Sequence, residues 1–512
     1  MKGPFGKERI CGVVATDTAR GMRAQIRRGL GKTRTFELRL DYLADQRERR
    51  ALFAWLGGHR PRAVFIATCR RLEGGGLFRG TREEQIGVLA GAVRAGCAWC
   101  DVEIETAKRI PIGELRRALA PARILVSYHD FRETPRNLAT VVRQLEKVRG
   151  DAVKVAAQCG SVSDSVRVCE SVRNRRDVVA IPMGEFGFAA RVLSLRMGSA
   201  LAYGSIEQAT APGQLSLEEM SDLYQAGRIT RRTRVYGVIG DPIGHSLSPL
   251  LHNTAFQARK FDAVFVPFLV RDLREFLSAM KGFGVQGLSV TIPHKETILR
   301  HLDGCDPLAE RIGAVNTVVV RGGGRLYGYN TDYVGALRSL ENRLRLAASR
   351  VLLFGAGGAA RAAAFALAQA GSIVCICARR PERARALARA AGAQTIAHAD
   401  LAHEYFDAIV NCTPIGMHSA ARGPTSRGGS PLTSAELNCR IVMDMVYRPR
   451  ETELLRLARR KGIEVVSGVE MFLAQGFAQY EIWTGERAPE RAMRRAVESA
   501  LDREEKSKQR RK

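Results

Sequence analysis

The sequence lacks the features of membrane, exported and disulfide-bonded proteins. It has no apolar run as long as the ~18 residues that a membrane-spanning helix requires. Residues 1–10 contain no apolar signal core and are not rich in serine, so we expect no targeting peptide and a cytoplasmic location. The 11 cysteines include one C-x-x-C pair, Cys97 and Cys100, without the second pair that a zinc site needs. A redox dithiol at this pair is an alternative, but its place beside a predicted barrel strand favours reduced, packed thiols, and we expect no bound metal.

Acidic residues are scarce relative to basic ones. The chain has 80 Lys and Arg against 52 Asp and Glu, which gives a formal net charge of +28. Such an excess is typical of proteins that bind nucleic acid or a membrane surface. The basic residues are dispersed, however, apart from Arg231-Arg232 and the segment 506–512. We therefore expect solvated helix faces, no nucleic-acid or membrane partner, and a positive field that attracts anionic metabolites.

Short apolar runs with strand character occur throughout the first part of this 512-residue chain. Most of the gaps between them hold helix-like segments. The eight runs are residues 10–16, 36–43, 63–70, 99–105, 123–130, 152–158, 178–184 and 201–206. Eight strand–helix units predict an α/β fold that begins with a (β/α)8 barrel over residues 1–227.

Polar side chains recur on one face, or near the carboxyl end, of several predicted strands. Charged groups on an inward face are costly to bury unless they are paired or used in chemistry. The carboxyl-terminal rim of such a barrel is where catalytic groups collect. The residues concerned are Glu37, Arg39 and Asp41 in one run, Asp101, Glu103 and Glu105 in another, and Arg70, His129 and Lys154 at or near the ends of three more.

Lys154 lies in the middle of a predicted strand, between Val153 and Val155. A lysine at a strand edge that reaches solvent is the simpler interpretation, but the apolar flanks and the inward direction predict desolvation. A desolvated lysine has a lowered pKa and becomes a nucleophile toward ketones. The resulting imine acidifies the neighbouring C–H bond, and His129 can move that proton, although a lone histidine is more often structural.

A polar, basic connector, residues 228–234, separates the predicted barrel from a second unit. A new strand begins at Val235 and opens a first lobe over residues 235–345, which the helical segment at about 471–500 completes. A Rossmann-like domain follows over residues 346–470, and a basic tail covers residues 501–512.

A glycine-rich loop follows an apolar strand and opens a helix in the second unit. Its residues are Gly355, Ala356, Gly357, Gly358 and Ala359. Glycines at these positions allow backbone N–H groups to approach a pyrophosphate, so cofactor binding is favoured over a plain turn. The next strand ends at Arg379 and Arg380, where an NAD-specific protein usually has an acidic residue. Arginine there favours NADP, although Arg380 before Pro381 is also compatible with a simple helix start.

A lysine and an aspartate, Lys295 and Asp332, lie upstream of this loop and suggest a hydride-transfer enzyme. Each candidate here also has a local explanation. Lys295 is compatible with a solvated lysine at a helix start. Ser248, which precedes Pro249, and Asp332 would both serve as helix N-caps.

A set of short motifs runs in order through residues 8–227: Glu37-x-Arg39-x-Asp41, Arg70-x-x-Glu73-Gly-Gly, Asp101-x-Glu103, Ser127-Tyr-His129-Asp-Phe, Val153-Lys154-Val and Thr210-Ala-Pro-Gly-Gln214. This set resembles type I 3-dehydroquinate dehydratase. The resemblance implies that Lys154 forms a Schiff base with the substrate ketone, that His129 is the general acid and base, and that Glu73 supports His129. It also implies substrate contacts by Glu37, Arg39, Arg70, Arg191, Thr210 and Gln214, with Arg191 facing the substrate carboxylate.

A second set of motifs runs in order from residue 240 to residue 475: Gly240-Asp-Pro-Ile-Gly-His-Ser246-Leu-Ser248-Pro, Val290-Thr291-Ile-Pro-His-Lys295, Ala314-Val-Asn316-Thr317, Gly328-Tyr-Asn-Thr-Asp332, Asn411-Cys-Thr413-Pro-Ile-Gly416, Met443-Asp-Met-Val-Tyr447 and the segment 468–475. This set, over about residues 235–495, resembles shikimate dehydrogenase. The resemblance implies that Lys295 and Asp332 form the catalytic pair. It implies substrate contacts by Ser246, Ser248, Thr291, Asn316, Tyr447 and Gln475, and cofactor contacts by the glycine loop, Arg379, Arg380, Asn411 and Thr413.

The second set departs from many relatives at two places. Ser289 stands where many have Asn, and Ala378-Arg379-Arg380 stands where many have Asn-Arg-Thr. The sequence of residues 289–295, Ser-Val-Thr-Ile-Pro-His-Lys, is similar to that of the fused, plant-type enzymes. The two resemblances together imply a bifunctional enzyme that dehydrates 3-dehydroquinate and then reduces 3-dehydroshikimate to shikimate with NADPH.

Three alternatives remain open from the sequence. The barrel has the Schiff-base lysine that class I aldolase-type enzymes also use, although Arg70-x-x-Glu73-Gly-Gly argues against that class. The reductase half is also compatible with a quinate dehydrogenase, although the paired Ser246 and Ser248 favour shikimate. The charge of +28 is compatible with a basic binding protein that retains inactive enzyme folds. Neither half requires a metal, and the sequence does not predict an oligomeric state.

Overall fold

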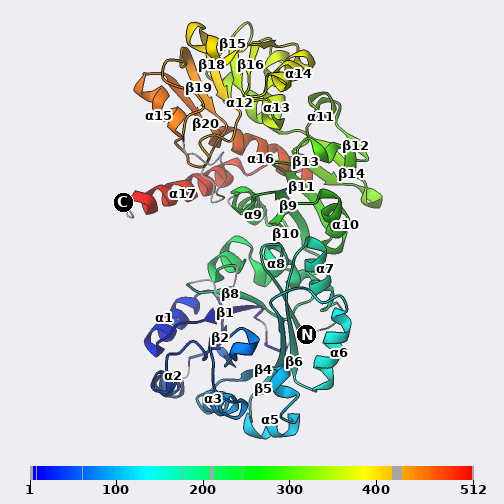
Figure 1. The fold of residues 1–512 in the computed structure, drawn as a ribbon, viewed down its shortest axis with the longest axis vertical. Coiled ribbons are helices and arrows are strands. Elements are labelled where there is room, and N and C mark those ends of the chain that lie inside the picture. Colours follow the sequence, from blue (N-terminus) through cyan, green and yellow to red (C-terminus); the bar gives the residue numbers. More distant parts are fainter. Residues whose placement is uncertain are drawn as a thin grey trace. The chain divides into compact units, whose positions relative to one another are not determined.

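The structure, a computed structural model, describes residues 4–6, 8–59, 61–173, 175, 177–207, 213–244, 246–417 and 429–509. The chain divides into two compact units, Met1–Val235 with Val266–Gly284 and Tyr236–Phe265 with Val285–Lys512. Both are built from alternating strands and helices (Figure 1), which confirms the predicted α/β class. Over the described residues, no helix is both long and apolar enough to cross a membrane.

Eight parallel strands form a nearly closed barrel in the first unit, as the sequence predicts. In the hydrogen-bonded order they are β7 (Val178–Met183), β6 (Ala152–Gln158), β5 (Arg123–Asp130), β4 (Trp99–Glu103), β3 (Val64–Thr68), β2 (Thr35–Arg39), β1 (Ile10–Val14) and β8 (Ala202–Ser205). Across the remaining seam, the backbone N–H of Ala200 donates to the carbonyl oxygen of Val178 at 2.9 Å. The strands therefore enclose a common interior.

Helices connect most of these strands and pack around them (Figure 1). They are α1 (Ala19–Gly29), α2 (Gln46–His59), α3 (Arg82–Arg94), α4 (Ile104–Ala107), α5 (Ile112–Ala118), α6 (Leu138–Lys147), α7 (Val162–Glu170) and α8 (Phe188–Met197). Several begin at a side-chain cap; for example, Thr81 and Glu84 form a reciprocal capping box at the start of α3.

The barrel interior changes character along the strands. On β4, the buried Trp99 is followed on the same face by Asp101 and Glu103. On β5, the buried Leu125 is followed in the same way by Ser127, which is fully buried. Because side chains on one face recur every second residue, the interior is apolar toward the amino ends of the strands and polar toward their carboxyl ends. The polar layer therefore lies where barrel enzymes hold their active sites.

A mixed sheet and a fully parallel sheet follow in the chain. The mixed sheet has the order β10 (Ala263–Leu269), β9 (Arg234–Gly240), β11 (Val285–Val290), β13 (Thr317–Val320), β14 (Leu326–Tyr329) and β12 (Gly304–Cys305). The helices that lie between or directly after its strands in the chain are α9 (Ser248–Arg259), α10 (Leu273–Phe283), α11 (Pro307–Ile312) and α12 (Asp332–Glu341). Strand β13 runs antiparallel to both of its neighbours, β11 and β14.

The parallel sheet has the order β17 (Gln394–Thr395), β16 (Ile373–Cys377), β15 (Arg350–Phe354), β18 (Phe406–Asn411), β19 (Cys439–Asp444) and β20 (Glu464–Ser467). Its helices are α13 (Gly358–Gln369), α14 (Pro381–Ala391) and α15 (Glu453–Arg460). The strand order is that of a Rossmann fold. The chain adds strands on one side of β15 as far as β17 and on the other side from β18 onward, so the order of the strands, not their direction, reverses between β15 and β18. Ligands in such sheets bind beyond the carboxyl ends of the strands at this reversal.

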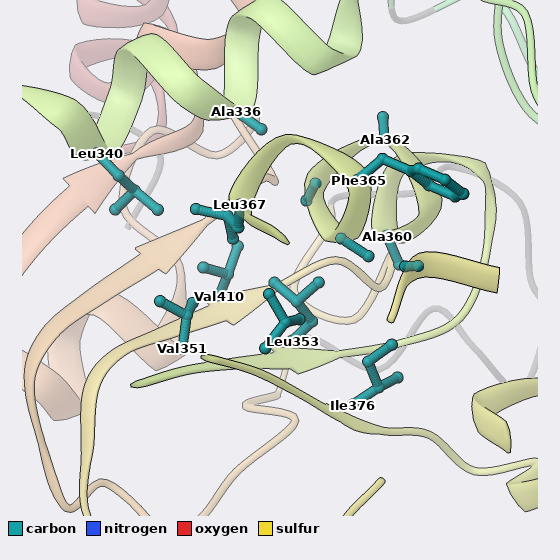
Figure 2. Packing of buried hydrophobic residues seen from close by; sticks show 14 of the residues in the cluster. Ala336, Leu340, Val351, Leu353, Ala360, Ala362, Phe365, Leu367, Ile376 and Val410 are labelled. Atoms are coloured by element: carbon teal, nitrogen blue, oxygen red, sulfur yellow. The ribbon is translucent and has the colours of Figure 1, made fainter. Parts of the chain in front are cut away.

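The core of the parallel sheet fixes the helix that follows the glycine loop. Figure 2 shows Leu353, Ile376 and Val410 on the strands beneath α13, which faces them with alanines and Leu367. Small alanine side chains allow a helix to approach a sheet closely, and the interior leaves few voids. The start of α13, and with it the glycine loop, is therefore held by packing rather than by the loop itself.

Two helices after the parallel sheet end the described chain, α16 (Gly468–Thr484) and α17 (Glu490–Gln509). Helix α16 packs on α9, β11 and β13, so it returns to the mixed sheet. The sequence predicts a basic tail from residue 501, but helix α17 continues through residues 501–509. Leu501 is buried there, and Asp502 and Glu504 form ion pairs with Arg450 and Arg448. These contacts explain why the helix continues.

Candidate active sites

Lys154 is a deeply buried charged residue of the barrel interior. Its side chain is only 2% exposed, and its flanks on β6 are the buried Val153 and Val155. Its Nζ lies 3.1 Å from Oε1 of Glu37 and forms a second ion pair with Asp101. A buried ammonium requires such partners, because an isolated one is costly to remove from water. The lysine is therefore inward and desolvated, as its strand position predicts.

Asp101 is the centre of the polar layer. Its Oδ1 accepts hydrogen bonds from Ser127 Oγ at 2.6 Å and from Arg70 Nη2 at 3.2 Å, and its Oδ2 faces Lys154. Burial alone raises the pKa of Asp101, but the charges of Lys154 and then Arg70 outweigh it and hold that pKa below its usual value. Asp101 therefore stays ionised and holds two cations and a hydroxyl in one arrangement.

His129 is held in its neutral form at neutral pH. Burial, followed by the nearby charges of Arg70 and Lys154, lowers the pKa of His129 well below its ordinary value. The distance from Arg70 Nη1 to His129 Nδ1 is 3.0 Å, and a guanidinium can only donate. Nδ1 therefore accepts, which assigns the ring proton to Nε2. Nδ1 is thus occupied by Arg70 in this arrangement.

Tyr203 on β8 is a neighbour of Lys154 that sequence reasoning missed. The Nζ of Lys154 lies 5.0 Å from the centre of the Tyr203 ring, in cation–π geometry. The Tyr203 hydroxyl is buried and has no hydrogen-bond partner among the described residues. Its spacing of two residues after the buried Leu201 is the signal that marks it as inward-facing.

The predicted substrate-binding arginines of the barrel have different surroundings. Arg39 donates to Asp41 through Nε at 3.0 Å and Nη2 at 2.8 Å, so its charge is paired. Arg191 on α8 is 5% exposed, and burial lowers its pKa to about 10. A buried cation of this kind suits an anionic partner. Gln214 is partly buried, while Thr210 lies outside the described residues.

Two acidic residues lie elsewhere than the sequence suggests. Glu73 is in a single 3-10 turn (Leu72–Gly74), is 67% exposed and pairs with Arg71 and Arg82. Its predicted support of His129 stays a prediction. Glu105, expected on the inward face with Asp101, is exposed, because β4 ends at Glu103 and α4 begins directly after it. Besides Asp101, the acid that lies beside Arg70 is Glu103, whose Oε1 is 3.8 Å from Nη1.

The second unit contains a cleft of about 430 Å³ between the ends of the two sheets. It is lined by every residue that the sequence predicts to contact the reductase substrate, and by Ala359 and Thr413 of the predicted cofactor site. The substrate candidates in its wall are Ser246, Ser248, Thr291, Asn316, Tyr447 and Gln475, together with Lys295 and Asp332. Segments far apart in the sequence therefore meet at one cavity.

Lys295 and Asp332 form an ion pair in this cleft. The Nζ of Lys295 lies 2.5 Å from Oδ2 of Asp332, and Asn316 Nδ2 donates to Oδ1 at 2.8 Å. Asp332 is the first residue of α12, whose N-cap is Thr331, and Ser248 is likewise inside α9, after Leu247. The helix-cap explanation therefore applies to neither side chain, and the Asp332 carboxylate is free to orient the lysine.

Gln479 supports the substrate side of the cleft and was also missed by sequence reasoning. Its Nε2 donates at 3.1 Å to Ser289 Oγ, to the Asn316 carbonyl oxygen and to Thr317 Oγ1. Its Oε1 lies 3.3 Å from Nε2 of the buried His252. Burial lowers the pKa of His252 to about 3, so the ring is neutral. The signal in the sequence is the spacing of four residues after Gln475 on one helix.

The glycine loop fits a dinucleotide. Gly355 has a φ of +126°, which side chains rarely adopt, and around Gly357 no described atom lies within 4 Å of where a Cβ would be. A Cβ on Gly358 would lie 3.2 Å from Cβ of Lys295, so the loop borders the catalytic pair. Arg379 and Arg380, after β16, are both exposed. The open loop at the start of α13 and these cations suit a phosphorylated dinucleotide.

Asn411 and Thr413 form the turn that follows β18, opposite the glycine loop. Asn411 is fully buried, and its Oδ1 accepts from Thr413 N at 3.0 Å and from Thr413 Oγ1 at 2.7 Å. A Cβ on Gly355 would lie 3.1 Å from Cγ2 of Thr413. The two segments after β15 and β18 are thus in contact at the reversal of the strand order.

Comparisons with known families match both halves of the chain. Residues 10–230 match the family of type I 3-dehydroquinases. Residues 238–318 match the shikimate dehydrogenase substrate-binding domain, and residues 468–498 match the C-terminal domain of shikimate 5'-dehydrogenase. Residues 350–428 match a family described as NADP oxidoreductase, coenzyme F420-dependent, over the segment that contains the glycine loop.

Individual relatives agree with these matches. The chain is 43% identical over 263 residues to a shikimate dehydrogenase (NADP(+)) of Bacillus cytotoxicus, covering 49% of this chain and 93% of that protein. It is 40% identical over 291 residues to one of Methanothermobacter thermautotrophicus, covering 54% and 100%. It is 35% identical over 477 residues to the chloroplastic bifunctional 3-dehydroquinate dehydratase/shikimate dehydrogenase of Arabidopsis thaliana, covering 88% of this chain and 78% of that protein. The chain belongs to this family of bifunctional 3-dehydroquinate dehydratase/shikimate dehydrogenases.

Proposed function

We propose that this protein catalyses two consecutive steps, the dehydration of 3-dehydroquinate and the NADPH-dependent reduction of the resulting 3-dehydroshikimate to shikimate. Residues 1–227 carry the first step, and residues 235–345, 346–470 and about 471–500 carry the second. The observation that supports it most is that one chain holds both a buried lysine between carboxylates, Lys154, and a Lys295–Asp332 pair beside a dinucleotide loop.

The barrel reaction begins with the Lys154 amine. After losing a proton, Lys154 Nζ adds to the substrate ketone, and loss of water gives an iminium ion. Glu37 and Asp101 then face the cation that has replaced the ammonium, which favours its charged form. The iminium acts as an electron sink for the adjacent carbon.

His129 moves the protons of the elimination. Once the substrate has displaced Arg70 from it, Nδ1 of the neutral ring takes a proton from the carbon next to the iminium. The hydroxyl of the following carbon leaves as water when the protonated ring returns that proton to it. Water then hydrolyses the imine and returns the Lys154 amine with the enone product. Arg191 is the candidate that binds the substrate carboxylate, because it is a buried cation of the same unit.

The reductase reaction uses the cleft of the second unit. NADPH supplies the hydride for the substrate carbonyl carbon. Lys295 donates a proton to the developing alkoxide, and Asp332 holds its Nζ in position. Ser246, Ser248 and Gln475 bind the substrate hydroxyls and carboxylate in this proposal, which their positions in the cleft wall support.

A coupled assay tests both steps. The purified full-length protein, given 3-dehydroquinate and NADPH, should form 3-dehydroshikimate and consume NADPH in the same reaction. Quinate offered with NADP should be oxidised more slowly than shikimate. Water loss without NADPH consumption would contradict the proposed reduction. NADPH consumption only with added 3-dehydroshikimate would contradict the proposed dehydration.

We also propose a cytoplasmic location. All eleven cysteines are free thiols in the structure, and free, buried thiols are typical of a reducing compartment. The named Arabidopsis relative is chloroplastic. Fractionation of cells that express the tagged protein, with antibodies to cytosolic and organellar markers, decides between these locations.

A further inference from the structure

The Asp444 carboxylate is fully buried at the carboxyl end of β19, and no chemical step proposed above uses it. Three donors converge on it. Asn411 Nδ2 at 2.9 Å and the Val446 backbone N–H at 3.0 Å donate to Oδ1, and Thr452 Oγ1 at 2.6 Å donates to Oδ2. Burial raises the pKa of Asp444 to about 6, so at neutral pH the carboxylate is mostly ionised and can accept all three bonds.

One arm of this network leads to the cofactor side of the cleft. The Asn411 amide that binds Asp444 also donates to the Ile415 carbonyl oxygen at 3.2 Å. Its oxygen accepts the two bonds from Thr413. Asp444 therefore fixes the amide around which the 411–415 turn is folded. That turn contributes Cys412, Thr413 and Pro414 to the cleft wall and touches the glycine loop at Gly355.

The other arm leads to the substrate side. The bond from Val446 N to Asp444 fixes the backbone immediately before Tyr447. The Tyr447 ring stacks on the Phe472 ring, with the ring centres 4.3 Å apart. Val446, Tyr447 and Phe472 all line the cleft. One carboxylate oxygen thus holds a segment on each side of the same cavity. Thr452, at the start of α15, holds the second oxygen and prevents the carboxylate from rotating.

We propose that Asp444 is a positioning residue of the reductase, whose carboxylate holds the 411–415 turn and the Val446–Tyr447 segment in one arrangement. This inference rests on the proposed reductase function. Asp444 is not among the residues that line the cleft, so it acts through Asn411 and Val446. Loss of its acceptor oxygens should displace both walls together, so binding of NADPH and of 3-dehydroshikimate should weaken in parallel.

The test is Asp444→Asn in the full-length protein. The amide has the same shape but places an N–H group opposite existing donors, so at least one of the three bonds is lost. Hydrogen bonds to charged groups are strong enough that we expect kcat/KM of reduction to fall roughly ten- to a hundred-fold. The KM for NADPH and the KM for 3-dehydroshikimate should both rise, while dehydration of 3-dehydroquinate stays unchanged and reports on the intact barrel.

Asp407→Asn is the matched control. Asp407 lies near the amino end of β18, the strand next to β19, and so at the opposite end of the parallel strands from Asp444. It also accepts a backbone hydrogen bond, from Arg350 N at 2.8 Å. Asp407→Asn should leave both KM values near those of the wild type. If Asp444→Asn lowers the unfolding temperature but leaves both KM values unchanged, Asp444 is merely structural and the inference is overturned.

Thr452→Val provides a second variant in case Asp444→Asn does not fold. It removes the hydroxyl that fixes Oδ2 but leaves the bonds from Asn411 and Val446, so both KM values should rise by a smaller factor. Unchanged KM values in a folded Thr452→Val protein would also contradict the inference. A wild-type protein that does not reduce 3-dehydroshikimate with NADPH would instead refute the proposed function, and the two failures are therefore distinguishable.

Discussion

The barrel site and the reductase site hold a lysine in different ways. Lys154 is 2% exposed and is surrounded by side chains from the strands of one closed barrel. Lys295 is 17% exposed and borders an open cleft whose wall comes from the loops of two sheets. The barrel therefore holds its lysine in a closed interior between two buried carboxylates. The reductase instead holds its lysine against one carboxylate, Asp332, in the wall of a cleft.

The largest expected effect separates the two sites completely. Lys154→Ala and Lys154→Arg should abolish dehydration, because neither has a nucleophilic amine at that position, and should leave reduction of added 3-dehydroshikimate intact. Lys295→Ala should do the reverse. Borohydride added with 3-dehydroquinate should attach substrate mass to the peptide that holds Lys154, as peptide mass spectrometry would report.

The choice of variant also tests the buried charges. Lys154→Ala leaves Glu37 and Asp101 without their cation, and breaking a buried ion pair costs about 3–5 kcal/mol. Lys154→Arg retains the charge and should destabilise less. Loss of both activities from either lysine variant would contradict two independent sites.

The next effect concerns His129. His129→Ala should still form the imine but dehydrate roughly 10²–10⁴-fold more slowly, because proton transfer typically contributes that much. Burial, with Arg70 and Lys154, lowers the pKa of His129 well below its ordinary value. A base with a lowered pKa remains unprotonated as the pH falls, so kcat/KM of dehydration should show no His129 inflection near pH 6.5, the ordinary histidine value. Full activity of the variant would remove His129 from the mechanism.

Arg379 should have a smaller effect, confined to the reductase and to one cofactor. Loss of a charge-assisted phosphate contact of ~1.5–3 kcal/mol should raise the KM for NADPH roughly ten- to a hundred-fold. NADH has no phosphate at that point, so its KM should hardly change in Arg379→Ala. Arg380→Ala is the matched comparison. Equal losses for NADPH and NADH would mean that Arg379 is structural, and a wild type that prefers NADH would refute the specificity argument.

The smallest expected effect concerns Tyr203. Its ring faces the cation on Lys154 at 5.0 Å, and such contacts contribute ~0.5–2 kcal/mol. Tyr203→Leu should therefore lower dehydration by a factor of a few to about thirty and reduce the yield of borohydride trapping. Tyr203→Phe retains the ring and should trap like the wild type. Equal trapping by the Leu and Phe variants would show that the ring does not stabilise the iminium.

The architecture could be predicted because strand spacing and inward alternation follow from local sequence. The barrel runs that end at Asp130 and Gln158 match the observed strands, and Lys154 faces inward as expected. The prediction that Glu105 faces inward was wrong, because it assumed that the strand continues to residue 105. The strand ends two residues earlier, at Glu103. Whether the Glu73 side chain contacts His129 depends on the conformation of the turn that carries Glu73, and no residue pattern specifies that conformation.

The candidate sites could be assembled from motifs only in part. Lys295 and Asp332 can be paired from the sequence, because each belongs to a motif of recognisable chemistry. Gln479 and Asp444 were not assigned roles, since their partners lie on other elements, Ser289 on β11 and Asn411 on β18. Contacts between polar groups on different elements arise only from tertiary packing. The spacing of residues along one element therefore does not predict them.

The position of α16 in the chain sets the order in which the two sites can be completed during synthesis. All eight barrel strands precede residue 206, whereas the reductase cleft needs Gln475 and Gln479, which are made after the whole parallel sheet. Domains generally fold as units from the amino terminus as they leave the ribosome. A nascent chain can therefore complete its lyase site while its reductase site still lacks one wall. Premature termination before residue 468 would retain the dehydration activity and abolish the reduction activity.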